Sequence, residues 1–196
     1  MHLNLEGRAM VSMRLFRTAD GFDAVLPATM LEAALKGLQK YALFSKATME
    51  ADPSRRVLGM TDAASAESFA GHPLHGSPAP RWMALVDQNE SLPDSIGDSQ
   101  GWLQTDIDAG EAHIYPGGED HWLPQALNYD VMDGVHFDKG CFLGQEVVAR
   151  MHFKGQMKQR LLAWQWPGDQ VPEVGATLRN EDGKAVGELV QAVHSD

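Results

Sequence analysis

The chain has 196 residues, of which 43% are hydrophobic and 22% charged, a balance that is typical of folded globular proteins and excludes a disordered chain. Its formal net charge of −11 argues against general attraction to phosphate backbones, so we expect no direct DNA binding and no direct contact with tRNA. Because no apolar run could cross a membrane, no targeting signal opens the chain and a single cysteine excludes an internal disulfide, we expect a cytoplasmic protein without membrane contact.

A hairpin is predicted near the start of the chain. Residues 7–17 alternate in polarity like a strand with one mainly apolar face. Asp20-Gly21 is a typical turn pair, and residues 22–26 then return as the second strand. We therefore expect an antiparallel pair of strands in this region.

A helix is predicted after this hairpin. Thr29 and Glu32 have the spacing of a capping box, in which each side chain binds the backbone N–H of the other residue. Apolar residues then continue at helical spacing to about residue 44. The next elements expected are short strands at 45–50, 56–60 and 82–86 and a weak helix at 62–70.

Residues 71–80 are rich in glycine and proline and predict a surface loop. His72 and His75 lie in this loop with a spacing that occurs in metal sites. Because the loop supplies no cysteine or carboxylate to complete a ligand set, we predict no metal site there.

The second half of the chain begins with a predicted helix that opens at residue 99. It carries Trp102 and ends at Gly110, since glycine commonly terminates helices. Taken alone, Trp102 is a typical core residue because tryptophan buries a large area. The remaining elements expected are a helix at 145–152, a strand at 160–166 and a hairpin with strands at 176–179 and 185–193.

The only cysteine lies in a distinctive segment. Cys141 follows Lys139 and Gly140 and precedes Gly144, so permissive backbone lies on both sides of the thiol. The predicted helix that follows places the thiol near a helix N-terminus, where unpaired N–H groups and the Lys139 ammonium favour the thiolate. Cys141 is therefore a candidate functional thiol, and the alternative is a small buried hydrophobic residue.

The stretch Lys139-Gly140-Cys141-Phe142-Leu143-Gly144-Gln145-Glu146 resembles the signature of the YgfZ family. That family belongs to a folate-binding superfamily that also contains the aminomethyltransferase of the glycine cleavage system. Three other stretches are similar to the family: Leu3-Asn4-Leu5-Glu6-Gly7-Arg8, Gln100-Gly101-Trp102-Leu103 with the turn that ends at Gly110, and Pro124-Gln125-Ala126-Leu127-Asn128. The resemblance covers most of the chain.

The resemblance implies an α+β fold, a GcvT-like mixed sheet with flanking helices followed by a partial C-terminal β-barrel. It divides the chain into a folate-binding domain at 1–156 and the partial barrel at 157–196. Because the family's proteins are longer, we expect the chain to lack the N-terminal portion of the family fold and the end of its barrel. Glu111-Ala112 departs from the family, which usually has an apolar residue and proline there.

The resemblance also implies a function: a tetrahydrofolate-binding factor that assembles or repairs iron–sulfur enzymes and so affects tRNA modification indirectly. Cys141 would be the working thiol with Lys139 tuning its charge, and Trp102, Gln145 and Glu146 would bind the folate. The implied cofactor is tetrahydrofolate, and the implied partners are iron–sulfur proteins or their assembly factors. We expect a non-enzymatic maintenance factor rather than an aminomethyltransferase.

Two other functions stay open at this point. An aminomethyltransferase relies on carboxylates rather than on a cysteine, so the Lys-Gly-Cys stretch argues against it. A thiol enzyme would pair Cys141 with a histidine such as His136 or His152. 

A basic strip also follows the cysteine segment, and it is either solvated or faces an anionic ligand such as a glutamate tail or RNA phosphate. Its residues are Arg150, His152, Lys154, Lys158 and Arg160.

Overall fold

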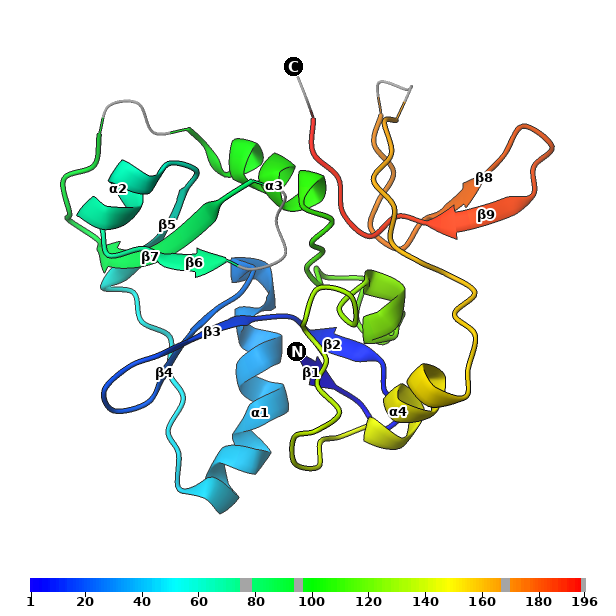
Figure 1. Ribbon diagram of the computed structural model, residues 1–196, viewed down its shortest axis with the longest axis horizontal. Coiled ribbons are helices and arrows are strands. Elements are labelled where there is room, and N and C mark those ends of the chain that lie inside the picture. The colour runs from blue at the N-terminus through cyan, green and yellow to red at the C-terminus, as the bar shows by residue number, and fades with distance from the viewer. Residues whose placement is uncertain (75–78, 94–96, 167–169, 195–196) are drawn as a thin grey trace.

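The computed structural model describes residues 1–74, 79–93, 97–166 and 170–194. In these ranges helices and short antiparallel sheets are mixed along the chain (Figure 1), so the predicted α+β class is confirmed. The helices are α1 (Leu31–Ser45), α2 (Ala63–Ser68), α3 (Ser99–Asp108) and α4 (Gln145–Phe153), with 3-10 turns η1 (Ala28–Met30) and η2 (Pro124–Leu127). The described residues form no closed barrel, and the GcvT-like arrangement stays a prediction.

The strands of the described residues pair antiparallel in small sheets. The two-stranded sheets are β1 (His2–Leu3) with β2 (Ala9–Val11), β3 (Arg14–Arg17) with β4 (Phe22–Val25), and β8 (Thr177–Arg179) with β9 (Ala185–Glu188). In the three-stranded sheet, β7 (Arg81–Asp87) lies between β5 (Arg55–Met60) and β6 (His72–Leu74). Figure 1 shows this sheet with α2 and α3 at the upper left and α4 at the lower right, with β1 and β2 between them.

The hairpin predicted near the start is confirmed as β3 and β4, with Arg14 opposite Val25. The long strand predicted at 7–17 is instead divided into β2 and β3, which belong to different sheets. The chain changes sheets at Ser12, whose buried hydroxyl oxygen accepts a hydrogen bond from the backbone N–H of Ile114 at 2.9 Å. A contact with a distant segment therefore ends the first pairing, and no local pattern announces it.

The predicted capping box of Thr29 and Glu32 is wrong. Thr29 lies inside η1, α1 begins after that turn, and no side chain caps its first residues. At its other end α1 extends to Ser45 and closes with Lys46 in the left-handed conformation (φ 52°). The strand predicted at 45–50 is absent, because Ser45 is the last residue of α1 and Lys46 is its C-cap.

The strands and weak helix predicted between residues 56 and 86 are confirmed as β5, α2 and β7. Asp62 caps α2, since its carboxylate accepts the N–H of Ser65 at 2.8 Å. The predicted loop at 71–80 is wrong in part, because β6 pairs with β7 inside it. Pro73 is tolerated there because β6 is an edge strand. His75, the second histidine of the metal-like spacing, lies outside the described residues.

The predicted helix around Trp102 is confirmed as α3. Asp98 caps its start, with the carboxylate accepting the N–H of Gly101 at 2.9 Å, and Gly110 follows its end at φ 68°. The second predicted helix is confirmed as α4, which ends one residue later than expected. No helix in the described ranges combines the length and the apolar character that crossing a bilayer requires.

The C-terminal hairpin is confirmed as β8 and β9, although β9 ends at Glu188 rather than at residue 193. The strand predicted at 160–166 is wrong, since no ladder partner pairs with this stretch among the described residues. Leu161 packs against the core, whereas Leu162 and Trp164 are 81% and 82% exposed. An alternating sequence forms a strand only where a neighbouring strand receives its hydrogen bonds.

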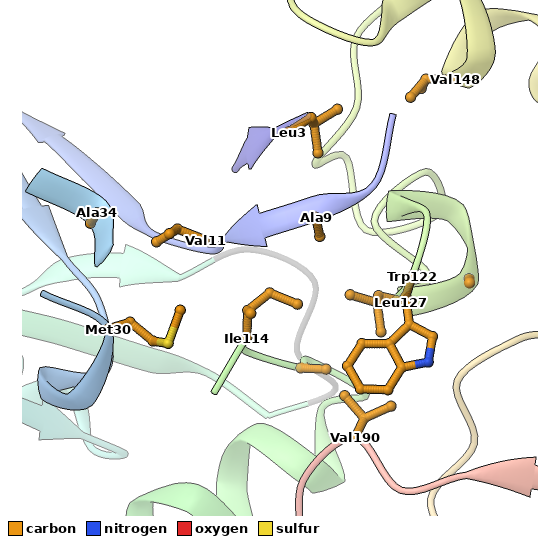
Figure 2. Close-up of a cluster of buried hydrophobic side chains, with 12 residues drawn as sticks. Leu3, Ala9, Val11, Met30, Ala34, Ile114, Trp122, Leu127, Val148 and Val190 are labelled. Carbon is orange, nitrogen blue, oxygen red and sulfur yellow. The ribbon is translucent and has the colours of Figure 1, made fainter. Parts of the chain in front are cut away.

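The main hydrophobic core joins early and late parts of the chain (Figure 2). Its buried residues are Leu3, Ala9, Val11, Met30, Ala34, Ala112, Ile114, Trp122, Ala126, Leu127, Val148 and Val190. Figure 2 shows the Trp122 indole beside Leu127 and Val190. The indole N–H also donates to the carboxylate of Glu188 at 3.1 Å. The C-terminal segment therefore packs on the same core as β1 and β2, and the domain boundary at 156–157 stays a prediction.

Candidate functional site

The cysteine segment forms a loop that leads directly into α4. Cys141 is exposed, as are Lys139 and Gly140 before it. Gly144 precedes the helix in the left-handed conformation (φ 76°), which costs a residue with a Cβ atom about 1–2 kcal/mol. The predicted loop followed by a helix is therefore confirmed, and the thiol is accessible to solvent.

Two glycines lock this loop against the turn between β1 and β2. A Cβ atom added to Gly144 would lie 2.5 Å from the Cα of Gly7 and 2.6 Å from the carbonyl oxygen of Asn4. A Cβ atom added to Gly7, which is itself at φ 75°, would lie 3.1 Å from the carbonyl oxygen of Gly144. Backbone thus packs directly on backbone, and the glycines of the stretches at 3–8 and 139–146 meet each other.

Side-chain hydrogen bonds hold the turn that carries Gly7. The Asn4 side-chain oxygen accepts the backbone N–H of Arg8 at 2.9 Å, and its amide donates to the Asp120 carboxylate. The Arg8 guanidinium donates to the carbonyl oxygen of His121. The stretch at 3–8 therefore forms a rigid turn on which the cysteine loop packs, a role that its family resemblance alone did not specify.

Gln145 closes the thiol loop on itself. Its side-chain oxygen accepts the backbone N–H of Phe142 at 3.1 Å, and its own backbone N–H donates to the Phe142 carbonyl at 3.2 Å. Cys141 comes immediately before this closed turn, so the backbone next to the thiol is held. Gln145 therefore shapes the loop, and its part in folate binding stays a prediction.

Lys139 and Glu146 lie on either side of the thiol in sequence and carry opposite charges. The Lys139 ammonium lies 4.9 Å from the centroid of the Phe142 ring, within the range of a cation–π contact. Glu146 is exposed in the first turn of α4, where the helix dipole stabilises a carboxylate. The loop thus brings together Lys139, Cys141, Gln145 and Glu146, all of the predicted site residues except Trp102.

Two further side chains anchor α4 and the chain that follows it. Gln125 is 1% exposed and donates through Nε2 to the carbonyl oxygen of Val148 at 2.7 Å. Asn128 donates to the carbonyl oxygen of Leu161 at 2.9 Å. No sequence pattern indicated a role for either residue, and the only signal for them was that their stretch resembles the family.

A small cleft lies beside the thiol loop, with a volume of about 360 Å³. Its lining residues are His2, Leu3, Asn4, Leu5, Glu6, Met10, Gly37, Lys40 and Leu143. Burial, then the charge of Lys40 and that of the terminal amine, hold the pKa of His2 below its ordinary value. The imidazole that borders the cleft is therefore neutral near pH 7. Leu143 is the contribution of the cysteine loop to this cleft.

Trp102 lies on α3 rather than at the thiol loop. Its indole packs over Gly59 of β5 so closely that no Cβ atom would fit there, and the Arg81 guanidinium lies 5.5 Å from its ring centroid. Figure 1 shows α3 and α4 on opposite sides of the β1 and β2 pair. The structure therefore does not bring Trp102 together with the other predicted site residues.

A buried network of two arginines and two carboxylates lies next to Trp102. Arg81 is 2% exposed and bonds to Asp106 and, at 2.9 Å, to Glu111. Arg14 bonds to the same two carboxylates at 2.9 and 2.8 Å. The charges balance, which offsets the cost of burying them. Sequence reasoning missed the network because its members are far apart in the chain, and Glu111 was noted only as a departure from the family.

The network sets the ionisation of its members. Burial opposes ionisation of Asp106, but the contact with His113 at 3.5 Å, the charge of Arg14 and the hydrogen bond from Arg81 outweigh it and hold the pKa of Asp106 below its ordinary value. Burial likewise opposes the charge of Arg14, but Glu111 and Asp106 raise its pKa. Arg14 and Asp106 therefore remain an ion pair throughout the neutral pH range.

A larger cleft, of about 620 Å³, opens beside this network. Its lining residues are Arg14, Leu15, Phe16, Arg17, His72, Pro73, Leu74, Glu111 and Asp133. The Phe16 and His72 rings stack with their centroids 4.6 Å apart, and the Arg17 guanidinium lies 4.9 Å from the Phe22 ring centroid. A pair of stacked aromatic rings with cations and a carboxylate nearby is suited to a planar charged ligand.

The histidines near the cysteine in sequence make other contacts. In the described part of the chain, no hydrogen bond joins Cys141 to His136 or His152. His136 lies 3.7 Å from Asp133, and His152 stacks on Phe137 with ring centroids 4.2 Å apart. This geometry does not favour a cysteine–histidine catalytic pair.

These features define an α+β protein with an exposed thiol in a loop that two glycines lock in place. The chain is 32% identical over 210 residues to the tRNA-modifying protein YgfZ of Pectobacterium carotovorum, across 93% of this chain and 63% of that protein. It is 31% identical over 222 residues to the protein of the same name from Escherichia coli and 32% identical to that of Shigella boydii. Each of these two alignments covers 98% of this chain and 68% of the relative.

The chain therefore belongs to the YgfZ family, as the cysteine stretch indicated. It spans between 63% and 68% of the length of these curated relatives. No family model matches the chain.

Proposed function

We propose that the chain is a tetrahydrofolate-binding factor for the assembly or repair of iron–sulfur enzymes, through which it affects tRNA modification. The names of its relatives support a part in tRNA modification. The observation that carries the proposal is the exposed Cys141 in a loop locked by the contact between Gly7 and Gly144. A reactive group held in one position is what a repeated exchange with client proteins requires.

The thiol is suited to transient contact with a cluster rather than to storage of one. An iron–sulfur cluster normally needs about four ligands, and the chain has one cysteine. No group of three or more metal-ligating side chains gathers in the described residues. In the proposal the cluster is therefore cargo or client, and Cys141 is one transient ligand toward it, with Lys139 beside it in the same loop.

In the proposal the folate binds in the 620 Å³ cleft. Its volume lies within the usual range of small-molecule sites, roughly 300–1,000 Å³. In the proposal a pterin ring extends the stack that Phe16 and His72 form, Glu111 accepts hydrogen bonds from its amino groups, and Arg17 attracts the glutamate tail.

The predicted folate residue Trp102 is linked to this cleft by one charged contact. Its indole lies against Arg81, and Arg81 bonds to Glu111, which lines the cleft. In the proposal the indole therefore helps to hold Arg81, and through it Glu111, in position at the folate site. A GcvT-like fold is part of the same proposal, because that fold is the folate-binding scaffold of the superfamily.

Calorimetric titration with tetrahydrofolate tests the folate site. We expect saturable binding that Phe16→Ala weakens about tenfold, the usual worth of one stacking contact, with a smaller loss in Trp102→Ala, because Trp102 acts through Arg81 and Glu111. Trp164→Ala is the matched control, because that indole is 82% exposed and lies outside the cleft. Absence of binding in the unaltered chain, or an affinity in both the Phe16 and Trp102 variants equal to that of the unaltered chain, would contradict the proposed site.

Genetic complementation tests the thiol. We expect Cys141→Ala to abolish rescue of a strain that lacks its YgfZ protein, with an unchanged melting temperature, because an exposed thiol contributes little to stability. Rescue by this variant would count against a working thiol. Robust glycine-cleavage turnover with a lipoylated carrier and tetrahydrofolate would instead make the chain an aminomethyltransferase.

A further inference from the structure

The C-terminal end of α4 gathers exposed cations around an exposed aromatic ring. Arg150, Phe153 and Lys154 are at positions i, i+3 and i+4, which lie on the same face of a helix. All three are exposed, and the Phe153 side chain is 69% exposed. Neither Arg150 nor Lys154 has an ion-pair partner in the described residues. Lys158, which is also exposed, follows Lys154 by four residues and lies beyond the end of the helix.

The exposed ring is held in place by two other rings. Phe137 and His152 stack with centroids 4.2 Å apart, and Phe153 meets them edge-on at 5.5 and 4.8 Å. Phe153 is thereby fixed although most of its surface is in contact with water. A fixed apolar ring that the protein does not bury is suited to stacking against something outside the protein. We call Phe137, Arg150, His152, Phe153 and Lys154 the basic–aromatic face.

We propose that the basic–aromatic face binds single-stranded RNA. Two kinds of contact dominate such binding, cations on the phosphates and aromatic rings on the bases, and this face supplies both. An acidic peptide would use the cations but would leave the Phe153 ring without a partner. The combination therefore favours RNA over an acidic protein.

The net charge of −11 does not oppose this proposal, because screening confines electrostatic effects to about 8–10 Å in physiological salt. The exposed groups at this end of α4 include Arg150, His152 and Lys154, while Glu146 lies at the opposite end of the helix. The exposed carboxylate of Asp138, which follows Phe137 in the chain, is itself followed by the exposed Lys139. The expectation of no tRNA contact used the charge of the whole chain, whereas binding depends on how charges are distributed.

The position of the face would place bound RNA near the thiol. The cysteine loop precedes the first residue of α4 and the face lies at its last turn. A helix of 9 residues is about 13 Å long, so RNA on the face would lie one short helix away from Cys141. This inference goes beyond the proposed function and requires neither folate nor an iron–sulfur cluster.

Fluorescence anisotropy with a labelled oligouridine of about 16 nucleotides tests the proposal. We expect Phe153→Ala to weaken binding about tenfold through loss of base stacking. We expect the double variant Arg150→Gln and Lys154→Gln to weaken binding and to reduce the slope of log affinity against log salt by about 1.4, which is about 0.7 for each lost phosphate contact.

Lys36→Gln with Lys40→Gln is the matched control, since these exposed lysines are also one turn apart, on α1. The proposal is overturned if this control weakens binding as much, if Phe153→Ala has no effect, or if oligouridine does not bind. Equal competition by polyglutamate of the same length would identify an acidic protein ligand instead. Trp102→Ala should leave RNA affinity unchanged, which separates this test from that of folate binding.

Discussion

The two regions that hold predicted site residues are built in opposite ways. At the thiol loop, Gly7 and Gly144 bring backbone against backbone, and close steric fit determines this contact. At α3, buried arginines and carboxylates join β3, β7 and the turn after the helix, and charge holds them together. The first region should be intolerant of a single added methyl group and indifferent to pH. The second should tolerate changes of shape and respond to charge.

The largest effect is expected from Gly144→Ala. The added Cβ atom would meet the Gly7 Cα and the Asn4 carbonyl at distances that Cβ atoms do not adopt, and it would also carry the cost of φ 76°. We expect a loss of roughly 3–5 kcal/mol in the free energy of unfolding, measured by urea denaturation.

If Gly144→Ala fails to fold, alanine substitutions at two other glycines test the same steric argument with smaller expected losses. Gly7→Ala should cost less, because its closest contacts are at 3.1 Å. Gly140→Ala should change stability by less than about 0.5 kcal/mol, since nothing lies within 4 Å of its Cβ position. Equal losses of unfolding free energy in all three variants would show that close steric packing does not stabilise the thiol loop.

The next largest effect is expected at the charged region, from Asp106→Asn. The substitution keeps the shape of the side chain and removes the charge that faces Arg14 and Arg81, which leaves buried guanidinium charge in excess. We expect a loss of about 3 kcal/mol at pH 7. The control is Asp108→Asn on the exposed side of α3, which should cost less than about 0.5 kcal/mol.

Acid should separate the two regions in the unaltered protein. The pKa of Asp106 is lower in the folded chain than its ordinary value near 3.9, so its contribution to stability is complete above about pH 4 and is lost as the pH falls toward the folded pKa. Asp106→Asn should therefore flatten the fall in stability on acidification, whereas Gly7→Ala should shift the curve without changing its slope. Denaturation midpoints between about pH 3 and 7 measure this difference. Parallel curves for the unaltered chain and Asp106→Asn would show that this carboxylate is not the titrating group.

The smallest effect concerns how the two helices begin. α3 starts with the carboxylate of Asp98, whereas α4 starts with Gly144 and has no side-chain cap. Asp98→Ala should cost about 1 kcal/mol, and Asp98→Asn should cost almost nothing because asparagine caps equally well. Thermal unfolding of the two variants tests this, and equal melting temperatures would show that the cap does not contribute.

Much of the local structure could be predicted from the sequence. The Asp20-Gly21 turn, the helical spacing after Gly144 and the closing Gly110 each depend on neighbours within a few residues, and each prediction is confirmed. The capping box at Thr29 failed because the chain enters α1 through a 3-10 turn instead. The strand at 160–166 failed because a strand needs a partner that periodicity cannot supply.

By itself, the sequence determined the family and the identity of the thiol loop through a contiguous motif, and it determined several local elements through periodicity. The resemblance to the family then implied the α+β class. Only the tertiary structure decided that Gly7 seats Gly144, that Glu111 completes a buried ion network, and that Trp102 lies away from Cys141. Each of these depends on segments that are distant along the chain and meet only when the core forms, so no local pattern of residues encodes them.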